Sequence, residues 1–203
     1  MKNLKTLITF LLAIILFNQK INAQAGTLDP TFGDGGIIIS DSLSYTNNSL
    51  LQVDGKILVL SSSGCIDRFN PDGSFDVNFG NSGRAYFKFD GRLHLDDTRL
   101  TIQDDGKIVC SGKYYAVTGN ILSGIFRSNS DGTLDSSFGE NGLDTVKIDK
   151  QQYPTGIVVQ ADGKIVVSGD VRKEYNDKKR TYLYRLMPNG GLDPTFGVNG
   201  IVV

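Results

Sequence analysis

The sequence predicts an all-β protein: tandem four-stranded antiparallel blades that form a partial, open β-propeller of about three blades. Three observations support this fold class. Short motifs recur in a fixed order along the 203 residues, Asp-Gly or Asn-Gly pairs punctuate apolar runs of strand length, and no window shows sustained helical periodicity. Radial repetition of four-stranded sheets limits exposed strand edges, as a propeller requires.

Three motifs define the repeat. The first, LD-x-x-FG or a close variant, begins four times at intervals of 47, 59 and 58 residues, in segments 28–33, 75–80, 134–139 and 192–197. The second, Q-x-DGKI, occupies 52–57, 103–108 and 160–165, and the third, centred on Asp-Gly or Asn-Gly, occupies 68–73, 127–132 and 185–190. Three motifs repeated in one order indicate tandem supersecondary units, with approximate bounds 37–83, 84–142 and 143–200.

The turn residues place the strands within each unit. The Asp-Gly of the second motif is expected to join the first two strands through a type I′ turn, since this pair flanked by apolar residues is a strong hairpin signal. The third motif ends the third strand, and the LD-x-x-FG segment then crosses over. Fourth strands are expected within 36–40, 84–89, 143–148 and 200–203.

Residues 1–23 are predicted to be a signal peptide. Lys2 and Lys5 precede the uncharged apolar run 6–17, and Ala23 ends an acceptable cleavage site. The run is shorter than the roughly 20 residues that span a bilayer. We therefore expect a secreted or cell-surface protein with no membrane span after signal cleavage, and with the repeats in 24–203; an uncleaved anchor is the alternative.

Charge argues against a nucleic-acid partner. Three of the 21 basic residues lie in the leader, which leaves 18 basic against 22 acidic residues. Nucleic-acid binding favours clustered Lys and Arg on a basic domain.

The two cysteines are not expected to pair. Cys110 stands where the parallel segments have a strand valine, so a small buried hydrophobe is the preferred interpretation. A Cys65–Cys110 bridge is the alternative, because exported proteins accommodate disulfides.

Together, the motifs resemble the delta-60 repeat, a β-propeller-type repeat of exported bacterial proteins. The resemblance covers about 26–203. It implies the propeller fold and an exported location, and it says little about chemistry, because family members are of unassigned activity.

The repeated apolar residues are interpreted as structural. We expect the first residue of each LD-x-x-FG motif to be a core plug: Leu28, Phe75, Leu134 and Leu192. We expect the later phenylalanine of each motif to pack between blades: Phe32, Phe79, Phe138 and Phe196.

No metal site is expected. Segments 70–76 and 129–135 look like the back half of a calcium-binding loop, but arginines stand where its first carboxylate belongs: Arg68, Arg127 and Arg185. We instead predict tight turns in which Asp and Asn bind their own backbone, with an Arg–Asp pair in each blade. The calcium ligands on the alternative interpretation would be Asn70, Asp72, Asp76, Asn129, Asp131 and Asp135.

Catalytic and cofactor-binding residues are not predicted either. His94 is the only histidine, so any Ser-His-Asp or Cys-His arrangement would depend on it. Asp96 and Asp97 are adjacent, and neighbours on an extended strand point to opposite faces. No glycine loop opens a helix to hold a phosphate.

The units differ most between their second and third strands. This connection spans 12 residues from Lys56 to Arg68, but 20 and 21 in the later units. Insertions on one face of a repeat array often mark its binding face, although a solvated hairpin loop is the open alternative. The candidate binding rim is Tyr114, Tyr115, Arg172, Tyr175, Lys178, Lys179 and Arg180.

These observations favour a secreted or cell-surface binding or scaffold module without catalytic activity, whose partner is an extracellular protein or glycan. The alternative is an enzyme acting on extracellular polysaccharide, with a site at the blade axis. Since propellers close with about four to eight blades, we expect three blades to be a piece of a longer repeat protein. Self-association through the open blade faces is the alternative.

Overall fold

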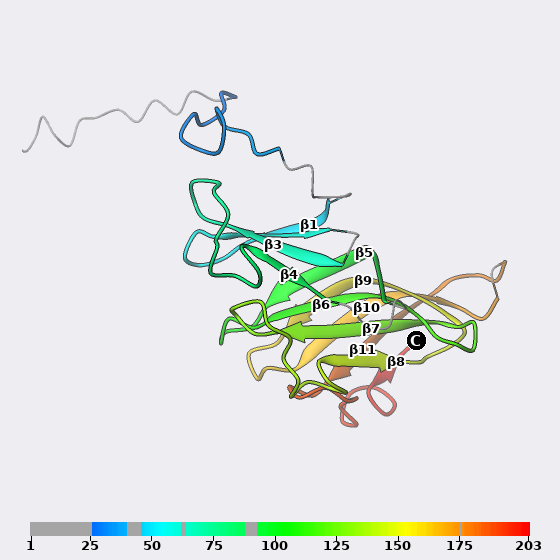
Figure 1. The fold of residues 1–203 in the computed structure, drawn as a ribbon. Coiled ribbons are helices and arrows are strands. Elements are labelled where there is room, and N and C mark those ends of the chain that lie inside the picture. Colours follow the sequence, from blue (N-terminus) through cyan, green and yellow to red (C-terminus); the bar gives the residue numbers. More distant parts are fainter. Residues whose placement is uncertain (1–25, 40–45, 62–63, 88–92, 175) are drawn as a thin grey trace, which may run out of the picture.

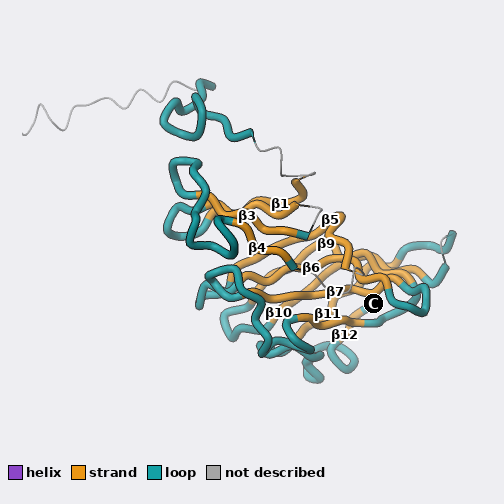
Figure 2. The backbone as a smooth tube through the Cα atoms, viewed as in Figure 1, coloured by secondary structure: helices purple, strands orange, loops and turns teal. Residues whose placement is uncertain are grey.

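In the computed structural model, the described residues are 26–39, 46–61, 64–87, 93–174 and 176–203 (Figure 1). Every regular element within these ranges is a strand (Figure 2). The predicted signal peptide lies outside them. The part of the chain that the structure describes holds no apolar helix of membrane-spanning length.

The strands form three successive units of four, paired antiparallel in chain order within each unit. The first unit contains β1 (Thr46–Leu51), β2 (Ile57–Ser61), β3 (Cys65–Phe69) and β4 (Arg84–Tyr86). The second contains β5 (Leu93–Ile102), β6 (Ile108–Tyr115), β7 (Ile121–Ser128) and β8 (Leu143–Val146), and the third contains β9 (Gln151–Val159), β10 (Ile165–Arg172), β11 (Arg180–Leu186) and β12 (Ile201–Val202). The all-β, open-propeller prediction is confirmed: the units follow one another without closing into a ring (Figure 1).

The apolar cores lie between units, and the middle unit contributes to both. On β6, Ile108 and Cys110 face the core shared with the first unit. The intervening Val109 faces the core shared with the third unit. This alternation follows from the two-residue period of a strand.

The cysteines are both buried, and neither takes part in a disulfide. Cys110 is the buried strand hydrophobe that the sequence predicted, and burial raises the pKa of its thiol. Cys65 lies beside Ser61, with Sγ 3.0 Å from the hydroxyl oxygen. The alternative of a bridge between them is therefore wrong.

The Asp-Gly hairpins form where predicted, but their turn type differs. Gln52 N–H donates to Lys56 O at 2.8 Å, and Gly55 N–H donates to Gln52 O at 3.0 Å. Only the glycine has a positive φ, +82°, so this is a three-residue loop with a type I turn and a left-handed glycine. Asp54 keeps an ordinary φ and its carboxylate accepts the Lys56 N–H at 3.2 Å. The type I′ prediction was wrong, and the same geometry recurs at Gly106 and Gly163.

The prediction of a fourth strand at 36–40 was also wrong for residues 36–39, which are the part of this range that the structure describes. Residues 36–39 form only an isolated bridge, between Asp34 and Ile37. The other fourth strands each pair with the third strand of their own unit. No third strand precedes the leading segment, defined here as residues 26–39, within the described chain.

The core-plug prediction is wrong for Leu28, Phe75 and Leu134, whereas Leu192 is partly buried and packs against the core shared by the second and third units. Leu28 is 59% exposed and Leu134 39%, Phe75 is similarly exposed, and Leu192 is half-buried. They cover glycines instead: a Cβ on Gly142 would lie 2.5 Å from Leu134 Cγ. The aspartate that follows is buried in three of the four motifs, at Asp76, Asp135 and Asp193. The interblade phenylalanines Phe79 and Phe138 are fully buried, as predicted, whereas Phe32 and Phe196 are only partly buried.

Candidate functional site

The two long loops between second and third strands extend from one edge of the arc (Figure 1). They connect β6 to β7 and β10 to β11. Two ion pairs tie the second loop to the start of β9: Lys150 binds Glu174, and Arg180 Nη2 lies 3.2 Å from Asp149 Oδ2. This edge is therefore a rim that loops and strand ends of two units build together.

A tyrosine on this rim is surrounded by cations. The Tyr153 ring centroid lies 5.0 Å from Arg172 Cζ, 5.5 Å from Lys113 Nζ and 5.9 Å from Lys179 Nζ. Arg172 Nη2 also donates to the Tyr153 hydroxyl at 3.0 Å, and that hydroxyl donates to Gln151 Oε1 at 3.1 Å. Cations within about 6 Å of a ring centroid are attracted to its π face. We call Tyr153, Lys113, Arg172 and Lys179 the cationic cluster.

Strand register brings the cluster together. Tyr153 pairs with Asp170, and Arg172 lies two residues further along β10, on the same face. A bulge between Ser168 and Gly169 sets this register. Lys113 comes from β6 of the neighbouring unit, so the cluster bridges two units.

The net charge of the cluster is positive. One acid contacts it at Lys179, where Asp170 Oδ2 lies 3.6 Å from Nζ. Both side chains of that pair are exposed, and exposed pairs contribute little stability. An incoming anion can therefore compete for Lys179 at small cost.

The structure brings only some of the predicted rim residues together. Arg172 and Lys179 belong to the cationic cluster, Arg180 is engaged with Asp149, and Lys178 is exposed. Tyr115 is exposed at the end of β6. Tyr175 lies outside the described residues.

Tyr114 belongs to a different surface. It lines a hollow of about 570 Å³ with Glu140, Asn141 and Asp144, between the second and third units. Because it neighbours Lys113 on a strand, it points to the opposite face.

Sequence reasoning missed Tyr153 and Lys113. Neither lies in a loop of unusual length, which was the signal used. Of the residues considered for catalysis, His94 pairs through its backbone with Lys113, and the side chains of residues 93–98 lie outside what the structure describes.

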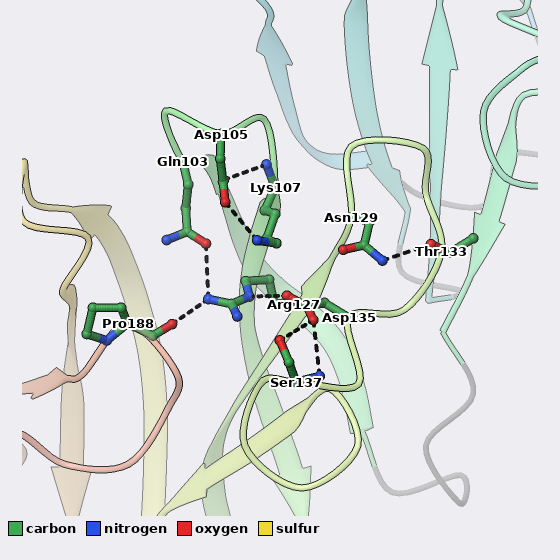
Figure 3. A network of polar contacts seen from close by, with 9 residues as sticks. All are labelled: Gln103, Asp105, Lys107, Arg127, Asn129, Thr133, Asp135, Ser137 and Pro188. Carbon is green, nitrogen blue, oxygen red and sulfur yellow. Dashed lines mark hydrogen bonds and ion pairs between the residues drawn. The ribbon is translucent and has the colours of Figure 1, made fainter.

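The third motif forms the predicted Arg–Asp pairs and Asx turns. Arg127 Nε lies 2.8 Å from Asp135 Oδ2 (Figure 3), and the pairs Arg68–Asp76 and Arg185–Asp193 have the same length. The Asp131 carboxylate accepts the Thr133 N–H at 2.9 Å. Within the described ranges, no three His, Cys, Asp or Glu side chains gather as a metal site would need.

The same arginines join each unit to the next. Arg127 Nη1 donates to Pro188 O at 2.5 Å (Figure 3), and Arg68 Nη1 donates to Ser130 O at 2.6 Å. Each guanidinium also lies over the phenylalanine of its own unit, with Arg127 Cζ 4.6 Å from the Phe138 centroid. We call this set of contacts the junction.

Backbone bonds complete the junctions. Gly80 N–H donates to Asp131 O at 2.7 Å, and Gly139 N–H donates to Asn189 O at 2.9 Å. The LD-x-x-FG loop of one unit is therefore held against the Asp-Gly or Asn-Gly turn of the next.

A family model described as DUF5122, a β-propeller domain of unknown function, matches residues 52–79, 103–138 and 160–196. Each match begins at the glutamine of the second motif and ends at the phenylalanine of the LD-x-x-FG motif. The protein contains DUF5122 β-propeller repeats. No curated protein matches the chain.

The DUF5122 repeats differ in length at the rim. The first match covers 28 residues, against 36 and 37 in the second and third. The later two contain the long β6–β7 and β10–β11 connections. Rim length therefore varies within DUF5122 repeats while the three motifs persist.

Proposed function

We propose that this DUF5122 protein is a secreted or cell-surface binding or scaffold module of the delta-60 type, without catalytic activity. We further propose that its rim binds an acidic extracellular glycan. The observation that carries the proposal is the cationic cluster, in which three cations from two units surround one partly exposed tyrosine ring.

A sugar acid suits this cluster better than a simple anion. The pyranose ring offers an apolar face to Tyr153, while its carboxylate or sulfate reaches Arg172, which can form a bidentate contact. Lys113 and Lys179 add positive charge near the same ring. The short first unit has no counterpart of the long loops, so the ligand is expected to contact the second and third units.

The test is binding of the exported protein to polygalacturonate, with dextran as the neutral comparison, measured by isothermal titration calorimetry. Arg172→Gln should weaken polygalacturonate binding at least about tenfold, corresponding to ~1.4 kcal/mol. Lys147→Gln removes an exposed charge outside the cluster and should leave affinity unchanged. Raising the salt concentration should weaken binding, because the contacts are solvent-screened.

Equal binding of both polysaccharides, or no loss in Arg172→Gln, would contradict the proposed ligand. Shortening of either polymer that persists in Arg172→Gln would instead favour the enzyme alternative. Size-exclusion chromatography of the polymer after incubation distinguishes that outcome from binding alone.

A further inference from the structure

Among the described residues, the third unit has the donor half of a junction, and no described turn lies against it. Its members are Arg185, Phe196, Gly197 and Val202, which we call the docking face. Arg185 Cζ lies 4.7 Å from the Phe196 centroid, as at the two completed junctions. The docking face therefore has the same arrangement that binds a turn of the next unit at the two completed junctions.

Two donors of the docking face lack the backbone acceptor that their counterparts have at the completed junctions, although Arg185 Nη2 does donate to Thr195 Oγ1 at 3.3 Å. Arg127 Nη1 donates to both Gln103 and Pro188 O, whereas Arg185 Nη1 has only Gln160 Oε1, at 3.5 Å, among the described residues. Within the same described ranges, Gly197 N–H has no acceptor. Val202 is 43% exposed.

The matching turn lies in the first unit, directly after β3. Pro71, Asp72 and Gly73 form the same turn that Ser130–Gly132 and Pro188–Gly190 present at the completed junctions. The leading segment occupies it: Gly33 N–H donates to Asp72 O at 2.8 Å. Ile38 Cδ1 lies 3.1 Å from the position of a Cβ on Gly73, so the fit is close.

This occupation is incomplete. Residues 28–33 are identical to residues 192–197, but the leading segment brings no arginine equivalent to Arg185. Among the described residues, none donates to the Pro71 carbonyl. A docking face would supply every contact that the leading segment makes and add the arginine.

We propose that two copies of this chain associate head to tail, the docking face of each replacing the leading segment on the Pro71–Gly73 turn of the other. Gly197 N–H then donates to Asp72 O and Arg185 to Pro71 O. Two copies of residues 26–203 bring six repeats, a number within the four to eight that close a propeller. A head-to-tail contact that closes gives a finite ring.

Sedimentation velocity of the exported protein over a range of micromolar concentrations tests this. The wild type should show a concentration-dependent monomer–dimer equilibrium. Val202→Lys should raise the dimer dissociation constant at least tenfold, because its long charged side chain would meet Gly73 of the other copy. Val117→Lys is the control: Val117 is a more exposed valine in the β6–β7 loop, outside the docking face, and its replacement should leave the dimer dissociation constant unchanged.

A second variant acts in the opposite direction. Gly33 has φ +57°, and a Cβ there would lie 2.4 Å from Ile37 O, so Gly33→Val should release the leading segment from the turn. It should strengthen the dimer, which loss of folding would not do. Monomers in all variants, a dimer insensitive to both changes, or an open-ended series of larger species would each overturn the proposal.

Discussion

Asp135→Ala removes one half of the buried ion pair at the junction between the second and third units. The side chains of Arg127 and Asp135 are each 7% exposed, with Nε and Oδ2 2.8 Å apart. Asp135 also accepts from Ser137, at 3.1 Å from the backbone N–H and 2.6 Å from the hydroxyl. The variant therefore leaves a guanidinium buried without its counter-charge.

Breaking a buried pair from one side costs about 3–5 kcal/mol. For a chain of this size, 1 kcal/mol shifts the melting temperature by about 2–4 °C, so a drop of about 10 °C is expected. Because Arg127 also holds Pro188 O of the next unit, the loss should extend across the junction.

Urea and thermal unfolding, followed by circular dichroism and tyrosine fluorescence, measure the change, since the chain has no tryptophan. Asp162→Ala is the control, because it removes an acid from an exposed pair with Lys164. The double variant Arg127→Met, Asp135→Leu should recover part of the loss, since no charge stays buried. If Asp135→Ala were as stable as Asp162→Ala, the assigned role of the junction pair would be refuted.

Three further changes have defined outcomes. Gly106→Val should lower the free energy of unfolding by more than about 1 kcal/mol, because φ is +82° there; an unchanged urea midpoint would contradict the turn geometry. Gly169→Ala should lower the melting temperature even when it is combined with Tyr182→Phe, which removes the hydroxyl 2.5 Å from the new Cβ. That Cβ would still lie 2.3 Å from the Tyr153 backbone oxygen, so full rescue by Tyr182→Phe would contradict this prediction. Acidification through and below the unfolded carboxyl pKa of 3.8 should progressively lower the urea midpoint, and this decrease should be smaller in Asp135→Asn than in the wild type.

The sign of the acid effect follows from the carboxylates. Hydrogen bonding from Lys56 lowers the pKa of Asp76 despite its burial. Burial opposes ionisation of Asp135, but Ser137 and Arg127 still hold its pKa below the ordinary 3.8. Stability from these groups is fully present above the unfolded pKa and is lost as pH falls through the folded value. An equally steep loss in Asp135→Asn would show that other groups dominate.

Much of the fold could be predicted because its signals are local. An Asp-Gly pair between apolar runs locates a hairpin, and the recurrence of three motifs counts the units. Hydrophobicity misassigned Leu134, which is exposed, whereas the neighbouring Asp135 is buried because it pairs with Arg127, eight residues earlier and on a different element. The sequence did predict an Arg–Asp pair in each blade, but not that this pair would be buried while the preceding leucine is exposed.

The cationic cluster could not be predicted from local sequence signals either, because its members come from distant parts of the sequence. Lys113 and Tyr153 are 40 residues apart in the sequence and belong to different units. Their approach depends on how neighbouring sheets are packed and on a bulge between β9 and β10. Loop length found Arg172 and Lys179, but the ring that gathers them lies within a strand.

Because the apolar cores lie between units, a single sequence repeat does not contain a complete core of its own. One repeat alone would leave an apolar face of its sheet uncovered, whereas any two neighbours share a core and a junction of the same design. Gene duplication can therefore lengthen such a chain by whole repeats without requiring a new packing solution. The rim loops contribute no residue to those cores, so they can differ in length and charge from one repeat to the next.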